Sequence, residues 1–399
     1  MSVEMKDSGI AWIGYVPKHW EVTRLKNVFC EYNVKSENGT ETLLSLSQYT
    51  GVKPKSETEL AGSHEAESYE GYKIVKAGQL VMNIMLAWNG SYALSDYDGM
   101  ISPAYCIYDF RTVCHKKYFH YLLRIDGYPS AFKTMSRGII DSRLRLYPEQ
   151  FYTFNTVVPP IVEQSRIANF LDKKCVDVDE LIALQEQMIA QLTTYKQAVI
   201  TETVTKGLDP NVKMKDSGVE WIGEIPEHWD VAKSKYFVSI NNGSDPKTEG
   251  DIPVYGSGAA SFKTCGEYKI GPTVLIGRKG ATLHIPHYIE GKYWNVDTAF
   301  DVKSKDNMIL RFYYYLAICF DYKFYISQTT LPGMAQSSYY NMLIPVPGIS
   351  EQQNIANYLD KKCKEIDELI SVKKDKIEKL KAYKKSVIYE YVTGKKQVI

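Results

Sequence analysis

Cysteine is scarce in this 399-residue sequence, and its seven cysteines form no CxxC pair. An odd, scattered set argues against a disulfide framework or a zinc knuckle and favours reduced thiols in a cytoplasm. No window holds the roughly 18 consecutive apolar residues that a membrane-spanning helix requires, and the polar stretch from Met1 to Gly9 is unlike a signal peptide. The sequence therefore predicts a cytoplasmic protein with no membrane partner.

The motifs of common catalytic sites are also missing. The segment from Gly271 to Lys279 comes near a GxxxxGK[ST] phosphate loop, but its spacing is wrong and no Ser or Thr follows. The [DN]PP[YF] motif of amino-methyltransferases is absent, since the one Pro-Pro pair is Pro159-Pro160. Neither GxSxG nor HExxH occurs, and the seven histidines do not cluster as metal ligands. We therefore predict no catalytic residue, no metal site and no cofactor bound by this chain itself.

The chain has almost no net charge, with 48 basic against 47 acidic side chains. Positive charge is nevertheless concentrated locally. Residues 232–347 carry 12 basic and 9 acidic side chains, and Lys133, Arg137, Arg143 and Arg145 lie close together with only Asp141 between them. Contact with phosphate requires local positive charge and not a high overall pI. The charge pattern is compatible with nucleic-acid binding but does not establish it.

The strongest positive feature is an internal repeat. MKDSGIAWIGYVPKHWEV at 5–22 returns as MKDSGVEWIGEIPEHWDV at 214–231, with twelve of eighteen positions identical. QSRIANFLDKKCVDVDELI at 164–182 returns as QQNIANYLDKKCKEIDELI at 352–370, with thirteen of nineteen identical. The two offsets are 209 and 188, so the first copy holds 21 extra residues between the shared segments. Such a repeat predicts two copies of one unit that differ mainly in their central parts.

Each copy ends in a segment that predicts a long helix. Apolar residues recur every seven positions or multiples of seven from 164 to about 206, and this row, the seam, is repeated in the second copy. The seam comprises Leu171, Val178, Leu192 and Val199, then Leu359, Ile366, Leu380 and Val387. Gln185 and Lys373 interrupt it at matching places, where they either fix the register or face solvent.

A companion row and the helix ends can also be predicted. The companion row comprises Leu181, Ile182, Met188, Ile189 and Tyr195, then Leu369, Ile370, Ile377 and Tyr383. Ser350 and Gln353 have capping-box spacing, and Gly207 and Gly394 can terminate the helices. If the copies obey a two-fold axis, the two helices pair as an antiparallel coiled coil.

The intervening segments predict variable domains of mixed composition. β-rich runs at 78–82 and 272–276 precede helical, aromatic-rich stretches at 118–123 and 312–318. The predicted fold is α+β, with two mixed α/β domains in tandem separated by the two long helices. The predicted boundaries are 1–160 and 209–348 for the domains, and 161–208 and 349–399 for the helices.

The order KDSGxxWIGxxPxHW, variable domain, P-x-x-x-EQxxIAxxLD and heptad helix, repeated twice, resembles the specificity subunit of Type I restriction–modification systems. The resemblance covers the whole chain. It implies that each variable domain is a target-recognition domain for one half of a bipartite, asymmetric site in double-stranded DNA. It also implies that the helices set the spacing and dock two methyltransferase subunits, and restriction subunits in the full complex. S-adenosylmethionine, ATP and Mg are then expected in those partners and not in this chain.

Candidate DNA-reading residues lie in turns and loops of the variable domains. Matched strands at 80–82 and 274–276 lead into matched Gly-closed loops, which carry Trp88 and Asn89 in one copy and Arg278 and Lys279 in the other. Phosphate contacts by basic side chains would fix the orientation, and polar side chains would read base edges in the major groove. The predicted DNA-binding residues are Gln48, Tyr49, Trp88, Asn89, Arg137, Arg143, Arg145, Tyr255, Ser257, Arg278, Lys279, Thr282, Gln336 and Ser337. The three arginines of 137–145 could equally form a solvated face.

The repeated segments have structural and docking interpretations. Trp12, Trp20, Trp221 and Trp229 recur in both copies, which favours packing over base stacking. The candidate docking residues for a partner are Asn169, Asp172, Asn357 and Asp360, which follow the repeated IAxxLD pattern. Two other classes remain open: a duplicated interaction scaffold for proteins, and an orphan DNA-binding protein with its own nuclease activity.

Overall fold

The computed structural model describes residues 4–58, 68–140, 143–258, 260–326 and 332–398. Its contacts divide the chain into two compact units, which are described separately below. Unit 1 comprises Met1–Leu184 and Lys376–Ile399, and unit 2 comprises Gln185–Asp375. Each unit therefore contains one variable domain, the first part of one long helix and the last part of the other.

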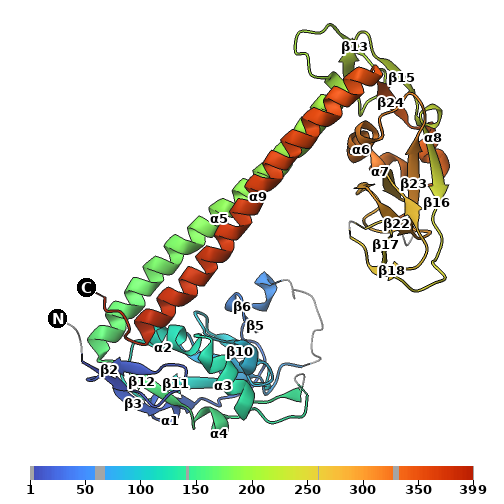
Figure 1. Cartoon of the computed structure of the whole chain (residues 1–399). Coiled ribbons are helices and arrows are strands. Elements are labelled where there is room, and N and C mark those ends of the chain that lie inside the picture. Colours follow the sequence, from blue (N-terminus) through green and yellow to red (C-terminus); the bar gives the residue numbers. More distant parts are fainter. Residues whose placement is uncertain (1–3, 59–67, 141–142, 259, 327–331, 399) are drawn as a thin grey trace. The chain divides into compact units, whose positions relative to one another are not determined.

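The variable domain of unit 1 is made of short strands and helices (Figure 1). Its strands are β1 (Met5–Asp7), β2 (Tyr15–Pro17), β3 (Glu21–Arg24), β4 (Phe29–Glu31), β5 (Leu44–Ser47), β6 (Gly51–Pro54), β7 (Lys73–Val75), β8 (Leu80–Asn83), β9 (Tyr92–Leu94), β10 (Gly99–Ile101), β11 (Tyr105–Phe110) and β12 (Asn155–Val158). Its helices are α1 (Leu25–Val28), α2 (Lys116–Leu123), α3 (Gly127–Met135) and α4 (Pro148–Phe151), with 3-10 turns η1 (Lys55–Glu57) and η2 (Ala87–Asn89).

The variable domain of unit 2 is also made of short strands and helices. Its strands are β13 (Met214–Asp216), β14 (Glu224–Pro226), β15 (Asp230–Lys233), β16 (Val238–Asn242), β17 (Ile252–Tyr255), β18 (Lys263–Cys265), β19 (Lys269–Ile270), β20 (Thr273–Gly277), β21 (His287–Ile289), β22 (Lys292–Asn295), β23 (Ala299–Ser304) and β24 (Leu343–Val346). Its helices are α6 (Leu310–Cys319), α7 (Tyr322–Tyr325) and α8 (Gln336–Asn341), with the 3-10 turn η4 (Ser234–Tyr236).

A four-stranded antiparallel sheet forms the centre of each domain, and the strand order corresponds between the copies. The order is β4-β11-β8-β9 in unit 1 and β16-β23-β20-β21 in unit 2. Leu80 pairs with Tyr108, as Val274 pairs with Val302. Strands β8 and β20 are buried along their whole length, which explains their continuous apolar sequences. The second, smaller sheet differs, because unit 2 has the order β18-β17-β22-β19 while unit 1 has the two-stranded pairs β5-β6 and β10-β7.

The matched elements locate the 21 extra residues of the first copy. The offset is 209 from Phe29 of β4 to Val238 of β16, and 194 from Leu80 of β8 to Val274 of β20. It is 188 from Asn155 of β12 to Leu343 of β24. The drop from 209 to 194 places 15 extra residues before β8, and the drop from 194 to 188 places six more before β12. The extra length therefore lies in the smaller sheet region and near α3.

The WIGxxPxHW segments anchor each domain, as the packing interpretation predicts. The side chains of Trp20 and Trp229 are only 2% and 0% exposed. Trp12 packs edge-on against Tyr128 in unit 1, and Trp221 packs in the same way against Phe320 in unit 2. The four tryptophans therefore pack within their units.

The two long helices are α5 (Ile161–Lys206) of 46 residues and α9 (Ile349–Val392) of 44 residues. Gly207 and Gly394 terminate them with φ of 77° and 70°, as predicted. The predicted capping box at Ser350 is wrong. The helix already begins at Ile349, and the Gln353 amide donates forward to Asn357 Oδ1 at 2.9 Å instead of back to the helix start.

Within each unit the parts of α5 and α9 run antiparallel. In unit 1 Lys384 Nζ lies 2.6 Å from an Asp179 oxygen, and in unit 2 Lys196 Nζ lies 2.7 Å from an Asp367 oxygen. Farther along unit 1, the rings of Phe170 and Tyr391 are 4.4 Å apart. In unit 1 the residue numbers of the contacting pairs therefore rise along α9 as they fall along α5, which confirms the predicted antiparallel pairing.

The seam is buried or half-buried along both helices, and Gln185 itself is 3% exposed. The companion row is only partly correct, because Leu181, Tyr195, Leu369 and Tyr383 are 44–51% exposed. Two paired helices bury one narrow stripe, so side chains on the flank of that stripe stay in solvent.

The helices also contribute to the domain cores. Leu171 and Val387 belong to the main apolar cluster of unit 1, and Val204 and Leu359 belong to that of unit 2. Each domain is therefore packed onto its own stretch of helix pair. Over the part of the chain that the structure covers, no helix combines the length and the apolar character needed to cross a bilayer.

Candidate nucleic-acid interface

Unit 1 brings the three predicted arginines to the loop that follows β8. Arg137 and Arg145 pair through two backbone hydrogen bonds of 2.9 Å, and Leu146 N donates to Ile84 O at 2.9 Å. The Arg145 guanidinium lies 3.7 Å from Met85 Sδ. Arg137 and Arg143 are exposed, whereas Arg145 is half-buried. Of the same stretch, Asp141 and Ser142 lie outside the described residues.

The β8 loop carries Trp88 and Asn89 on η2. The Trp88 indole N–H donates to Met85 O at 3.0 Å, and the Lys133 ammonium lies 4.9 Å from the Trp88 ring centroid. Asn89 Oδ1 accepts hydrogen bonds from the N–H and hydroxyl of Ser91 at 3.1 and 2.7 Å. Its carbonyl oxygen therefore holds the loop, which leaves the amide nitrogen as the group available for a base edge. The basic cluster and the β8 loop form one surface, which we call loop surface 1.

Gln48 and Tyr49 lie elsewhere in unit 1. The Gln48 carbonyl accepts a hydrogen bond of 2.6 Å from the Arg124 guanidinium. Tyr49 is 85% exposed and lines a cleft between the domain and the helices, together with Lys117 and Lys384. Among the described residues, no hydrogen bond joins this turn to loop surface 1.

In unit 2 the equivalent loop follows β20. Met334 N donates to Arg278 O at 2.9 Å, and Gly280 N donates to Pro332 O at 2.9 Å. Gly280 has φ of 115°, a backbone conformation that favours glycine, and a Cβ there would lie 2.8 Å from Ser257 Oγ. Ser257, Arg278, Lys279 and Thr282 are thus gathered on one surface, loop surface 2. Leu331, which precedes Pro332, lies outside the described residues.

Arg278 is half-buried and Lys279 is exposed. The Arg278 guanidinium donates to Asp297 O at 3.3 Å and lies 5.8 Å from the Phe300 ring centroid. Within the described part of the chain, Asp297 O is the one hydrogen-bond acceptor of this guanidinium, which leaves most of its five N–H donors for a second partner. Since a fork of donors matches guanine O6 and N7, the side chain can make a bidentate contact in a major groove.

Two predicted residues of unit 2 are used inside the fold. The Gln336 amide donates to Ile240 O at 2.5 Å, and the half-buried Tyr255 ring packs against a small apolar cluster that contains Leu275. Ser337, one residue after Gln336, is exposed on α8. Gln336 and Tyr255 therefore stabilise the fold behind this surface, while the exposed Ser337 faces solvent.

The sequence interpretation missed aromatic rings that lie beside lysines. Phe262 and Tyr268 are 60% and 51% exposed, and the Lys292 ammonium lies 4.4 Å from the Tyr268 ring centroid. Exposed rings beside cations are suited to base stacking and phosphate contact. The sequence signal was present in the dipeptides Phe262-Lys263 and Tyr268-Lys269, but a dipeptide does not reveal which rings are exposed.

The predicted docking residues separate into two kinds. Asn169 and Asn357 are exposed. Asp172, by contrast, binds Lys117 and Tyr121 of α2, and Asp360 binds Arg311 and Tyr315 of α6. The two carboxylates therefore hold the domain of their own unit. Over the described residues, no group of three or more His, Cys, Asp or Glu side chains is arranged to hold a metal ion.

The chain is similar to specificity subunits of Type I restriction enzymes. The family model of the Type I restriction modification DNA specificity domain matches residues 226–382. The Type I restriction enzyme MjaVIII specificity subunit of Methanocaldococcus jannaschii is 25% identical over 424 residues, which cover 96% of this chain and 94% of that protein. The putative type I restriction enzyme MjaX specificity subunit of the same organism is 26% identical over 304 residues, or 70% and 68% of the two chains.

Two solved structures share the fold. A chain from a type I R-M system complex has a TM-score of 0.73 at 17% identity, over 94% of this chain and 98% of that one. The HsdS subunit from Thermoanaerobacter tengcongensis has a TM-score of 0.54 at 17% identity, over 95% and 98%. At this identity the two structures support the tandem-domain, long-helix architecture alone.

Proposed function

We propose that this chain is a specificity subunit of a Type I restriction–modification system, which its similarity to such subunits supports, and that it reads a bipartite DNA site with one variable domain for each half. The observation that carries this is the pair of loop surfaces. They follow equivalent strands of equivalent sheets, β8 and β20, yet present different side chains. Equivalent strands that lead into loops with different side chains are suited to reading two different half-sites.

On each surface, the charged side chains and the hydrogen-bonding side chains would have different roles. Exposed cations such as Arg137, Arg143 and Lys279 would contact phosphates and fix the orientation of the duplex. Arg278 and the Asn89 amide would read base edges, while Ser257, Thr282 and Ser337 supply neutral donors and acceptors. Trp88 and Tyr49 offer aromatic faces. The protein itself carries no chemical step in this proposal.

The partners supply the chemistry. Methyltransferase subunits that bind S-adenosylmethionine would extrude and methylate an adenine, a step that costs a few kcal/mol in lost stacking. Restriction subunits would use ATP and Mg. The specificity subunit would hold both half-sites while its partners distort the DNA.

The test is to co-express the chain with its methyltransferase in a host without other modification, and to map methylated adenines by sequencing. We expect one two-part, asymmetric motif. In the Arg278→Ala variant, one position in one half-site should become degenerate, because a bidentate arginine–guanine contact contributes about 1–3 kcal/mol of discrimination. The other half-site should not change. If the Arg278→Ala variant directs the same methylated motif as the wild type, Arg278 does not read a base. If the wild type directs no motif, the proposed function is wrong.

Docking of the methyltransferases is proposed at Asn169 and Asn357 and at an apolar patch of the long helices in each unit. Unit 1 exposes Leu181, Leu184 and Tyr383, and unit 2 exposes Leu369, Val372 and Tyr195. The two patches match residue for residue at the offset of 188. On an antiparallel coil Leu181 and Tyr383 hold equivalent heptad positions on one flank. Two equal patches fit two copies of one partner.

For this docking we expect Leu184→Glu to reduce the bound methyltransferase from two copies to one, and Leu184→Glu with Val372→Glu to remove both. A buried unpaired charge disfavours an apolar interface strongly. Native mass spectrometry of the purified complex measures the stoichiometry. Ile139→Glu is the control, because Ile139 is fully exposed and belongs to the variable domain and not to a long helix. Two methyltransferases on the double variant would rule out the patch.

A further inference from the structure

Three side chains at the start of α5 attach the variable domain of unit 1 to the helix. Glu163 accepts hydrogen bonds from His19 at 2.6 Å and the Trp20 indole at 2.9 Å. The Gln164 side-chain oxygen Oε1 accepts from His115 N at 2.9 Å, just before α2. Two turns later, Asp172 accepts from Lys117 Nζ at 2.7 Å and from the Tyr121 hydroxyl at 2.8 Å.

Unit 2 repeats this arrangement at the start of α9. Glu351 accepts from Trp229 at 2.9 Å and lies 3.2 Å from His228, and Gln352 accepts from Ile309 N at 2.8 Å. Asp360 binds the Arg311 guanidinium at 2.6 Å and the Tyr315 hydroxyl at 2.6 Å. The contacts of Asp172 and Asp360 thus recur between domains whose other surfaces differ. We call each carboxylate with its tyrosine and cation a clamp.

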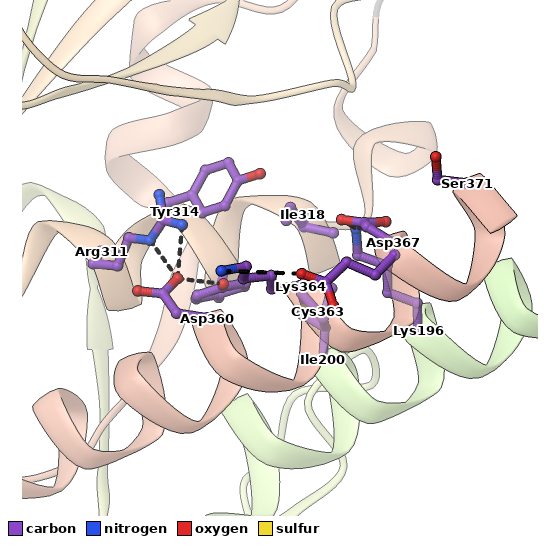
Figure 2. A pocket seen from close by; sticks show the side chains of 12 residues that line it. Lys196, Ile200, Arg311, Tyr314, Ile318, Asp360, Cys363, Lys364, Asp367 and Ser371 are labelled. Atoms are coloured by element: carbon purple, nitrogen blue, oxygen red, sulfur yellow. Dashed lines mark hydrogen bonds and ion pairs between the residues drawn. The ribbon is translucent and has the colours of Figure 1, made fainter.

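Figure 2 shows the Arg311 guanidinium and the Asp360 carboxylate turned toward each other beside the helix. Burial, and then the hydrogen bond to Asp360, raise the pKa of Tyr315, so its hydroxyl stays a donor. Burial alone would lower the pKa of Arg311, but the contacts with Asp360 and neighbouring tyrosines raise it. In the clamp of unit 2, Arg311 and Tyr315 therefore keep their protons over the whole ordinary pH range.

Because the clamp lies far from the other attachment point, a small displacement at the clamp changes the angle between the domain and its helix. Glu163 and Asp172 are nine residues apart, which is about 13 Å along a helix. A slip of about 1.5 Å at the outer contact would turn the domain by about 6°. Across a small domain of about 30 Å this moves the far edge by about 3 Å, close to the rise of one base pair.

We propose that Asp172 and Asp360 are positioning residues, which fix the angle of each recognition domain on its helix and so restrict binding to a single number of base pairs between the half-sites. The proposal rests on the bipartite-site function above. It replaces partner docking as the main role of these two carboxylates. Asp172 and Asp360 act through Tyr121 and Tyr315 and need not touch DNA.

The test compares the methylated motifs directed by the wild type and by the Asp172→Ala, Asp360→Ala double variant. We expect unchanged half-sites, but roughly tenfold more methylation at sites whose spacer is one base pair longer or shorter, since charge-assisted contacts would no longer hold the angle. Tyr121→Phe with Tyr315→Phe, which removes one hydrogen bond from each clamp, should broaden the spacer in the same direction. This milder pair decides the question if the alanine variant directs no methylation.

Asp179→Ala with Asp367→Ala is the matched control. It also removes two carboxylates of the same helices, but these bind lysines of the opposite helix and not the domains. The spacer should then stay single. Weaker methylation with a single spacer in the clamp variants, or equal broadening in the control, would overturn the proposal. A wild type that directs no two-part motif would instead remove the proposed function itself, and this proposal with it.

Discussion

A half-chain of residues 1–208 is expected to form a homodimer that directs methylation of a palindromic site. It contains the first variable domain and the whole of α5. The contacts of the helix pair explain why α5 can pair with itself. Asp179 binds Lys384, and Lys196 binds Asp367. At the repeat offset of 188, Lys196 corresponds to Lys384 and Asp179 to Asp367, so two copies of α5 would form the Asp179–Lys196 pair twice.

The apolar contacts support the same pairing but less completely. Val199 and Val204 of α5 correspond to Val387 and Val392, which lie in the core of unit 1. Tyr391, which stacks on Phe170, corresponds to Thr203, so the homodimer lacks this aromatic contact at both ends. Each such pair contributes about 0.5–1.5 kcal/mol. The dimer should therefore form, but more weakly than the natural pairing, and dissociate on dilution.

Analytical ultracentrifugation measures the association, and sequencing of methylated host DNA measures the site. A charge exchange supplies the control. Asp179→Lys in the half-chain places lysines opposite each other and should lower association, whereas Asp179→Lys with Lys196→Asp should restore it. A monomer that stays inert with the methyltransferase, or an asymmetric motif, would contradict the pseudo-two-fold arrangement.

The repeat made the framework predictable from the sequence. Two copies of the Leu171–Val199 spacing were enough to predict two long helices and their antiparallel pairing, because a seven-residue apolar period is typical of helices that pack along each other. The strands at 80–82 and 274–276 were predictable for a similar reason, since a short apolar run between Gly-rich turns favours a buried strand. The companion row failed at Leu181 and Tyr195, because period alone does not tell how wide a stripe the partner helix covers.

The roles of individual polar side chains were much less predictable. Asp172 follows a helical pattern and was expected to face a partner protein. It instead accepts hydrogen bonds from Lys117 and Tyr121, which lie more than fifty residues earlier in the chain. Gln336 looked like a loop residue for DNA, yet its amide binds Ile240 O almost a hundred residues away. Such contacts depend on tertiary packing, which neither spacing nor composition encodes. Arg278 and Lys279 share a surface with Ser257 because Gly280 lies close to Ser257, and this approach of two separate loops is not visible in the sequence.

A one-heptad insertion after Gln185, matched by one after Lys373, is expected to abolish methylation at the original motif. Both positions are the polar interruptions of the seam, so the added heptads keep the apolar period on each helix. Seven residues lengthen a helix by about 10 Å, or about three base pairs of DNA. Three base pairs also turn the duplex by roughly a hundred degrees, with 10–10.5 base pairs to the turn, whereas a heptad returns the helix to nearly the same face.

The two effects make the outcome specific. If the domains can follow the turn, sequencing should show the same half-sites with a spacer longer by about three base pairs. If they cannot, the variant should direct no methylation, while three inserted heptads, about 31 Å and close to a full DNA turn, should restore a motif with a much longer spacer. Thermal unfolding of each variant controls for loss of the helix pair. Methylation of the original motif by the one-heptad variant would show that the length of the helices does not set the spacing.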